Sequence, residues 1–347
     1  MESAAERPVL AIDLGGTQIR TALVTPDRRV HARRAEPTDD HAGPEAVLDR
    51  IRHLVEETRL EAGSLELPDP IGVGVSSPGP LDPASGTVLE PPNLAGWRDV
   101  KLGPFLENAL DLPTFVERDT TVAARAEWCF GAGRGTDDLV YLTVSTGVGG
   151  AAIIGGRPLT GPRGTAGEFG HVVVDMNGPR CGCGGVGHVE AIASGTALAR
   201  AGGELVRRGE APILARSVSD PGAIDAEDVA VAAAAGETAC ADLLERAWVA
   251  IGSLCASLVN ALNPEVIVIG GGIAEHHPRL YEVARAEVSR RAMPFLVDRV
   301  RIVPAALGPD VSLIGALPIV TERIGDPRFD GSHRPRTAAA HGGTPHP

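Results

Sequence analysis

The chain has 347 residues, with 32 basic and 45 acidic side chains and a formal net charge of −13 at pH 7. This length suits one large or two medium-sized domains, and the acidic balance argues against a nucleic-acid partner, which requires a basic patch. No apolar run reaches the roughly 18–20 residues of a membrane span, the N-terminus lacks a signal-peptide pattern, and the few cysteines do not make a disulfide scaffold. We therefore expect a cytoplasmic protein without a membrane partner.

The first half of the chain begins with a predicted β-hairpin. An apolar strand over 9–12, a glycine turn over 13–17 and a return strand over 19–24 make up this hairpin. The remaining elements expected in this half are a helix over 44–62, a buried strand over 71–75, a loop over 76–80, a helix over 105–110 and a strand over 114–116 that ends near Asp119.

The second half repeats the pattern of the first. A strand over 139–144, a glycine turn over 145–150 and a return strand over 151–154 predict a second hairpin. The elements expected after it are a glycine-, cysteine- and histidine-rich loop over 161–190, a helix over 239–262, a buried strand over 265–269 and a third glycine turn over 270–272. These repeated units predict a duplicated α/β fold. The polar composition of residues 325–347 predicts disorder.

The three glycine turns each follow an apolar strand. Glycine lets backbone N–H groups approach an anion closely, whereas the P-loop and dinucleotide fingerprints are absent. Asp13 ends the first strand, where its carboxylate suits a Mg²⁺ ion beside a phosphate. A plain hairpin turn would explain any one of these turns, and a turn-forming aspartate would explain Asp13. Their combination favours phosphate binding.

These motifs carry a family resemblance. Asp13-Leu14-Gly15-Gly16-Thr17, Ser145-Thr146-Gly147-Val148-Gly149-Gly150 and Gly270-Gly271-Gly272 resemble the sugar-kinase/actin/heat-shock ATPase superfamily. Within it, Gly167-Glu168-Phe169-Gly170-His171 and the Cys181–Glu190 stretch resemble the ROK family (repressors, open reading frames, kinases). The resemblance covers about residues 8–320. ROK repressors carry an N-terminal helix-turn-helix domain that we do not expect here, which leaves the kinase branch.

The resemblance implies an α/β fold of two ribonuclease-H-like (actin-like ATPase) domains with an interdomain cleft. The small N-terminal domain would comprise residues 1–117 plus about 305–324, and the large domain residues 118–304 with a zinc loop. The family also implies a homodimer or homotetramer. ATP binding is implied for residues of the three glycine turns: Asp13, Gly15, Gly16, Thr17, Ser145, Thr146, Gly147, Gly149, Gly270, Gly271 and Gly272.

The resemblance also implies a structural Zn²⁺ site at His171, Cys181, Cys183 and His188. The family has cysteine at the last position, and His188 keeps the number of donors at four, since two thiolates and two imidazoles suit tetrahedral Zn²⁺. The alternative is that the metal has been lost and the two cysteines are free thiols. A site with four protein ligands has no open position for water, so the expected role is structural.

Asp119 matches the catalytic aspartate of the family. Phosphoryl transfer to an alcohol needs a carboxylate that accepts the hydroxyl proton, and an ordinary turn aspartate is the alternative. The family has asparagine before this aspartate, and here the position is Arg118. An arginine there could bond a sugar hydroxyl, pair with an acidic group or point away.

Glu168, His171 and Glu190 match sugar-hydroxyl ligands of the family, and carboxylates suit hydrogen bonds from vicinal diols. His171 would bond the sugar with one ring nitrogen and zinc with the other. Asn93 resembles a residue that reaches a ring hydroxyl from the small domain, with a loop turn as its alternative. Trp97 is expected to pack rather than to stack on sugar.

The leading hypothesis is therefore an ATP-dependent hexose kinase that phosphorylates the 6-hydroxyl of glucose or a glucose-like sugar. Arg118 and His188 keep an aminohexose (kanosamine-type) 6-kinase as an alternative. A non-catalytic sugar-sensing protein is a second class, against which Asp13, Asp119 and the glycine turns argue. A peptide-binding ATPase chaperone is disfavoured by Glu168 and Glu190. The expected cofactors are ATP, Mg²⁺ and structural Zn²⁺.

Overall fold

The computed structural model describes residues 7–162, 164–218 and 220–326, and it divides into two compact units. Of the described residues, unit 1 includes those up to Asp119 and those from Ala316 to Asp326, and unit 2 includes those from Thr120 to Gly315. Each unit contains a five-stranded sheet with helices packed on both of its faces. Within the described residues, no helix is long and apolar enough to cross a membrane.

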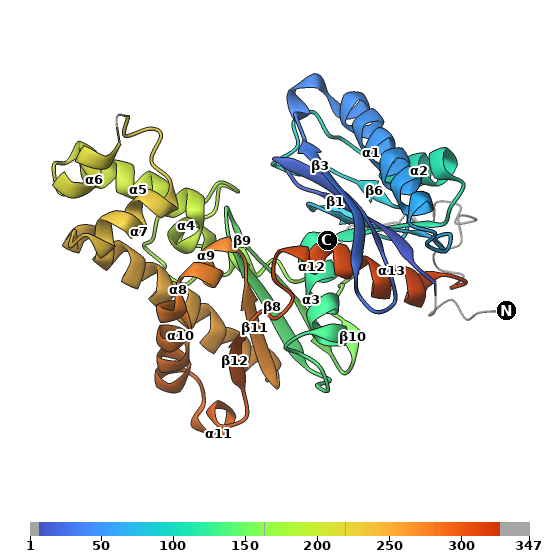
Figure 1. Ribbon diagram of the computed structural model, residues 1–347. Coiled ribbons are helices and arrows are strands. Elements are labelled where there is room, and N and C mark those ends of the chain that lie inside the picture. The colour runs from blue at the N-terminus through green and yellow to red at the C-terminus, as the bar shows by residue number, and fades with distance from the viewer. Residues whose placement is uncertain (1–6, 163, 219, 327–347) are drawn as a thin grey trace, which may run out of the picture. The chain divides into compact units, whose positions relative to one another are not determined.

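Unit 1 is built on a sheet whose strands lie in the order β3 (Val30–Pro37), β2 (Gln18–Val24), β1 (Val9–Leu14), β4 (Val73–Ser77) and β7 (Thr114–Arg118) (Figure 1). The predicted hairpin is confirmed, because β1 and β2 pair antiparallel with Val9 opposite Val24. β1, β4 and β7 run parallel, so their carboxyl ends share one edge of the sheet. A separate short pair, β5 (Leu81–Asp82) and β6 (Thr87–Val88), lies outside this sheet.

Helices cover both faces of the unit 1 sheet. Leu10 and Ile12 point from β1 into a core shared with α1 (Pro44–Ser64) and α2 (Leu102–Leu110). On the other face, Gly72 and Gly74 lie under α13 (Ala316–Arg323), where a Cβ on Gly74 would be 2.7 Å from the Cβ of Ala316. The glycines therefore allow a helix from the far end of the chain to pack directly on the sheet.

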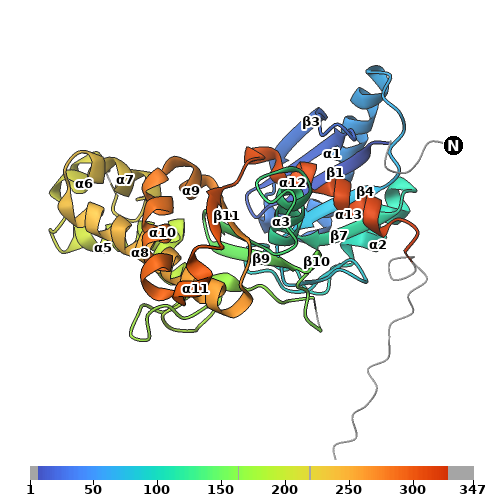
Figure 2. The same ribbon diagram turned by 90° about the horizontal axis from the view of Figure 1, so that it is seen from below.

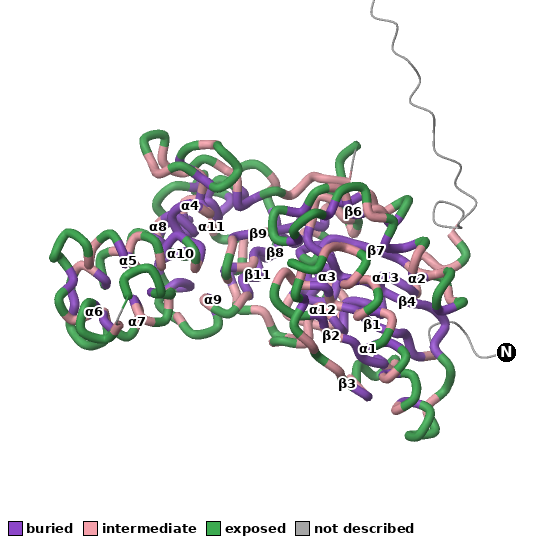
Figure 3. Tube along the Cα trace, turned by 90° about the horizontal axis from the view of Figure 1, so that it is seen from above, coloured by how far each residue is buried: buried purple, intermediate pink, exposed green. Residues whose placement is uncertain are grey.

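Unit 2 repeats this topology with strands in the order β10 (Arg157–Pro158), β9 (Val148–Ile154), β8 (Leu139–Val144), β11 (Val266–Gly270) and β12 (Arg301–Pro304). β8 and β9 form the second predicted hairpin, and β11 runs parallel to β8 and β12. The strands at the centre of both sheets are largely buried (Figure 3). The repeated hairpin-plus-parallel-strand pattern confirms the expected duplication.

The helices of unit 2 form two layers. Val140 and Leu142 face a core with α8 (Thr238–Leu262) and α10 (Pro278–Arg291), whereas Leu139 and Tyr141 face α3 (Asp119–Phe130). Three further helices, α5 to α7, gather beside α8 around a second, smaller core that includes Cys240 of α8 (Figure 2). The bounds are α3 (Asp119–Phe130), α4 (Glu190–Ala193), α5 (Gly195–Arg207), α6 (Pro212–Ser217), α7 (Ala226–Ala234), α8 (Thr238–Leu262), α9 (Gly272–His276), α10 (Pro278–Arg291), α11 (Pro294–Val297) and α12 (Val311–Ile314), with 3₁₀ turns η2 (Asp40–Ala42), η3 (Phe169–His171) and η4 (Gly308–Asp310).

The chain leaves unit 2 and returns to unit 1 after Gly315. The sequence predicts this return near residue 305. The fully buried Glu127 of α3 accepts hydrogen bonds from the backbone N–H groups of Ala306 (2.8 Å) and Leu307 (2.9 Å). Gly315 also packs closely against Val122, since a Cβ there would lie 2.5 Å from Val122 Cγ1. These contacts keep the segment up to Gly315 in unit 2. The predicted tail lies outside the described residues from position 327 onward.

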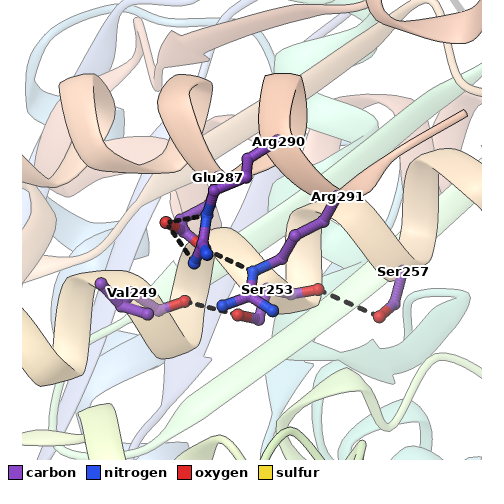
Figure 4. A network of polar contacts seen from close by, with 6 residues as sticks. All are labelled: Val249, Ser253, Ser257, Glu287, Arg290 and Arg291. Carbon is purple, nitrogen blue, oxygen red and sulfur yellow. Dashed lines mark hydrogen bonds and ion pairs between the residues drawn. The ribbon is translucent and has the colours of Figure 1, made fainter. Parts of the chain in front are cut away.

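α8 and α10 cross closely in unit 2, with a polar group between them (Figure 4). Glu287 of α10 is largely buried and accepts hydrogen bonds from Arg290 (Nη2 to Oε2, 2.7 Å) and from Arg291. Burial raises the pKa of Glu287, but the bonds from the two arginines outweigh it, so the pKa lies below its usual value. The ion pairs of Glu287 with Arg290 and Arg291 therefore stabilise unit 2 at neutral pH, and this contribution is lost as Glu287 becomes protonated in acid.

We expect Gly252→Ala to destabilise this crossing. A Cβ on Gly252 would lie 2.6 Å from Glu287 Cβ, so the helices must separate, at a cost of about 1–3 kcal/mol. Gly63→Ala in α1 is the matched control, because no heavy atom lies within 4 Å of its added Cβ and alanine favours a helix by about 0.5–1 kcal/mol. Thermal melting of both variants checks this. A Gly252→Ala protein that melts like the wild type would refute the close crossing.

Candidate functional site

The glycine turn of unit 1 is held by a residue distant in sequence. Gly15 N–H donates to the carbonyl of Gln18 (2.9 Å), which closes the turn between β1 and β2. The buried Thr38 donates its hydroxyl to the Gly15 carbonyl (2.6 Å) and its N–H to the Thr17 carbonyl (2.9 Å). Sequence reasoning identified the turn but missed Thr38, because no local pattern links the two segments.

Asp13 lies near the end of β1 and is paired across the hairpin with Arg20. The two residues are direct neighbours in the antiparallel register. Arg20 donates to Asp13 Oδ2 from Nε (2.9 Å) and from Nη2 (2.5 Å), and both side chains are largely shielded from solvent. Arg20 therefore orients the carboxylate that was predicted to face Mg²⁺. The predicted hairpin already placed Arg20 near Asp13 on the neighbouring strand, so Arg20 could have been predicted as its partner, but it was not.

The exposed Asn93 lies against the same glycine turn. A Cβ on Gly16 would be 2.8 Å from the carbonyl oxygen of Asn93, so the two predicted site residues are in contact. The loop is tied down where Ala95 N–H donates to Asp40 Oδ2 (2.7 Å). Trp97 is 1% exposed and belongs to the core of unit 1, which confirms its packing role.

Arg118 and Asp119 follow one another at the end of β7. Arg118 is 4% exposed, and its aliphatic stem packs on Gly79, where a Cβ would lie 2.9 Å from Arg118 Cδ. Asp119 begins α3 and is exposed, so its carboxylate is accessible at the N-terminal end of a helix, where negative charge is favoured. The predicted base is thus presented to solvent, while the residue before it is buried under the loop that follows β4.

The second and third glycine turns lie together in unit 2. Gly271 has φ +95°, and a Cβ there would be 2.5 Å from the Val144 carbonyl oxygen, so only glycine fits at this approach. The start of α5 is attached to the second turn, since Gly195 N–H donates to the Ser145 carbonyl (2.8 Å) and the Thr196 hydroxyl to the Thr146 carbonyl (3.0 Å). The structure therefore places Ser145–Gly149 and Gly270–Gly272 next to each other.

Glu190 connects the second glycine turn with the cysteine-containing loop. Its Oε2 accepts the N–H of Val148 (3.2 Å), and a Cβ on Gly147 would lie 2.8 Å from the same oxygen. Its Oε1 accepts the thiol of Cys181 at 3.6 Å. The half-buried carboxylate of Glu190, a predicted sugar ligand, thus contacts both a predicted phosphate turn and a predicted metal ligand, Cys181.

Glu168 immediately precedes η3, and His171 is its last residue. His171 N–H donates to the Glu168 carbonyl (3.1 Å), and Glu168 is exposed. The turn packs on β9 through Gly170, whose added Cβ would be only 1.8 Å from the Val148 carbonyl oxygen. Because Val148 also bonds Glu190, the 3₁₀ turn beside Glu168 and His171 and the Glu190 side chain both contact the same residue of β9.

The four predicted metal ligands come together. One donor atom from each of His171, Cys181, Cys183 and His188 lies within 4.8 Å of the others. The sulfur–nitrogen distances are 3.8 Å for Cys181–His171 and 3.2 Å for Cys183–His188. Tetrahedral Zn²⁺ with ordinary bond lengths would place sulfur and nitrogen about 3.6 Å apart, so this donor set fits the ion.

The Glu190 carboxylate adds negative charge beside this cluster, and a bound cation would offset it. Burial raises the pKa of the Cys181 thiol, and the nearby Glu190 carboxylate raises it further. A bound divalent ion reverses that effect by stabilising the thiolate. Among the described residues, the other cysteines belong to no such group of metal-ligating side chains. Cys240 and Cys255 are in the cores, burial raises the pKa of Cys255 to about 12, and Cys129 is half-buried.

A hollow of about 580 Å³ opens along α5. It begins at Thr196, the residue bonded to the second glycine turn. Arg200 and Arg207 line it from the helix, and Asp220 and Ile224 line it from the segment that follows α6. Its volume is typical of a small-molecule site.

Comparison with known proteins gives consistent matches. The model of the ROK family matches residues 9–323. A glucokinase from Thermotoga maritima is 35% identical over 317 residues, which cover 91% of this chain and 98% of that protein. An N-acetylmannosamine kinase from Shigella flexneri is 36% identical over 311 residues, which cover 89% of this chain and 96% of that protein.

The solved structures agree. A ROK family glucokinase from Streptomyces griseus, in complex with glucose and AMPPNP, aligns with a TM-score of 0.75 and 30% identity, covering 89% of this chain and 98% of that one. This likeness and the repeated sheet pattern confirm the predicted actin-like ATPase fold of two ribonuclease-H-like domains.

Proposed function

The chain belongs to the ROK family, and from that membership we propose that it transfers the γ-phosphoryl group of ATP to the 6-hydroxyl of glucose or a glucose-like hexose. At the coarser level it is a sugar kinase, as its glucokinase and N-acetylmannosamine kinase relatives are. One observation carries the proposal: in each unit a candidate sugar ligand contacts a phosphate turn. Asn93 lies on Gly16 in unit 1, and Glu190 bonds Val148 in unit 2.

ATP is assigned to the three glycine turns and to the hollow along α5. The backbone N–H groups of the turns suit phosphate oxygens, and Asp13 would hold the Mg²⁺ side of the site. Mg²⁺ supplies charge neutralisation of the phosphates when bound. The hollow continues from Thr196, beside the second turn, and we assign it to the adenosine portion.

The acceptor sugar is assigned to Asn93, Glu168, His171 and Glu190, with Asp119 as base. Asp119 accepts the proton of the 6-hydroxyl as the oxygen attacks the γ-phosphorus. The new O6–phosphorus bond forms while the bond to the β,γ-bridging oxygen breaks, and ADP leaves. The cluster of His171, Cys181, Cys183 and His188 would hold structural Zn²⁺ and fix the orientation of His171.

Other properties are assigned from the family alone. We place the protein in the cytoplasm as a homodimer or homotetramer, with a small-molecule sugar as its partner. An aminohexose is the second acceptor class, since Asp119, Glu168 and Glu190 supply negative charge that tolerates an ammonium group. A sugar-sensing role without catalysis would require Asp119 and the glycine turns to serve no reaction.

The test is a panel of acceptors with ATP: glucose, mannose, N-acetylmannosamine, glucosamine and kanosamine, compared by kcat/KM. We expect glucose or its closest relatives to rank first, with phosphate found on the 6-oxygen by NMR of the product. An N-acetylated or amino sugar in first place would replace the acceptor assignment. No ATP consumption with any sugar, while sugar still binds, would favour the sensing protein.

We expect Arg118→Asn to change the ranking of acceptors more than the KM for ATP. Arg118 is buried beside Gly79, one residue before the base, so shortening it alters the support of Asp119 and of the loop after β4. The glycine turns are untouched by the change. The acceptor panel measured with both proteins, together with their melting temperatures, checks this. An unchanged ranking in a stably folded variant would show that Arg118 only packs.

A further inference from the structure

A short segment between β3 and α1 contacts both substrate loops of unit 1. Thr38, at the end of β3, bonds Gly15 through its hydroxyl (2.6 Å) and Thr17 through its N–H (2.9 Å). Two residues later, Asp40 accepts the Ala95 N–H at 2.7 Å. One contact reaches the phosphate turn, and the other reaches the loop that carries Asn93.

The segment itself is held from α1. Arg50 donates to the Thr38 carbonyl and lies 3.6 Å from Asp39 Oδ2. Gly43 N–H donates to the Asp40 carbonyl (3.0 Å), which closes η2 in front of the helix. Thr38 is therefore bonded to α1 through Arg50, Asp40 is bonded to the residue that precedes α1, and each of the two holds a different loop.

The Asp40 bond has a direct consequence for Asn93. Asn93 is exposed and lies on Gly16. Further along the loop, Trp97 is buried and Asp99 N–H donates to the Leu89 carbonyl (2.9 Å), but the Asp40 bond holds the loop closer to Asn93, at Ala95. A hydrogen bond from N–H to a carboxylate is stronger than one to a neutral acceptor. Asp40 thus fixes the backbone two residues from the candidate sugar ligand.

We propose that Asp40 is a positioning residue for the acceptor sugar and Thr38 a positioning residue for ATP. This rests on the proposed function, because it takes Asn93 as a sugar ligand and Gly15–Thr17 as a phosphate turn. Neither side chain touches the reacting atoms. Each acts through the loop that it holds.

Steady-state kinetics with glucose and ATP test the proposal. Asp40→Ala should raise the KM for glucose about tenfold and leave the KM for ATP within about twofold, since one charge-assisted hydrogen bond is lost. Thr38→Val should do the reverse, raising the KM for ATP more than the KM for glucose. Asp40→Asn retains an acceptor oxygen and should restore most of the affinity for glucose. Asp49→Ala, at an exposed aspartate of α1 that pairs with Arg52, is the matched control and should match the wild type.

Amide hydrogen exchange gives a readout that is independent of turnover. Asp40→Ala should accelerate exchange at Ala95 about tenfold or more, without a comparable change in α1. Equal effects of both variants on both KM values, or unchanged exchange at Ala95, would overturn the proposal. If the wild-type protein phosphorylates no hexose, the proposed function fails, and exchange at Ala95 still decides whether Asp40 holds the loop.

Discussion

Asp119→Asn is expected to lower kcat by about 10²–10⁴ while the Kd for the acceptor sugar changes by no more than a few-fold. Asparagine has nearly the same shape and can still accept a hydrogen bond from the sugar hydroxyl, but it cannot take the proton. The structure supports this choice because Asp119 is exposed at the end of β7, whereas Glu117, two residues earlier, is buried and paired with Arg323.

The measurement is single-turnover phosphoryl transfer combined with calorimetric binding of the sugar. Asp111→Asn is the matched control, since Asp111 is an exposed aspartate that follows α2 in the left-handed conformation, which asparagine also adopts well. This control should behave as the wild type. If Asp119→Asn keeps kcat within a few-fold of the wild type, another group accepts the proton.

Loss of the metal is the second large effect. We expect about one Zn²⁺ per chain by elemental analysis. Cys181→Ser is expected to remove it, to lower the melting temperature and to raise the KM for sugar by about 100-fold or more. The loop has little core of its own, because Val173, Met176 and Val186 are 52%, 86% and 43% exposed. Structural zinc contributes about 10–16 kcal/mol to small zinc peptides, so the ion would be the main support of this loop.

The large effect on sugar follows from the contact between Cys181 and Glu190. Glu190 lies between the cysteine and the Val148 N–H, and His171 is itself a predicted zinc ligand, so collapse of the loop displaces both sugar ligands. Cys129→Ser, at a half-buried cysteine outside the cluster, is the control and should keep the metal. A metal-free wild-type protein with full activity and an unchanged melting temperature would contradict the zinc assignment.

Short-range patterns predicted much of this fold. The alternation of apolar residues around the glycine turns predicted both hairpins, and the periodicity over 239–262 predicted α8 almost to its ends. Helices that carry weak patterns were not predicted. α3 is buried over most of its length, so it has no polar face to reveal its period, and α10 alternates charges with small apolar residues.

Local signals in the sequence pointed to the turn glycines and to Asp13, whereas the family resemblance supplied Asp119, the sugar ligands and the metal ligands. The contacts that support these residues became visible in the tertiary structure. Thr38, Asp40 and Arg20 act through contacts with segments that local patterns do not connect to them, and α13 joins unit 1 through close packing on Gly74. Such contacts depend on where the folded chain brings distant segments together. Side-chain periodicity, which reports only the nearest few residues, does not contain that information.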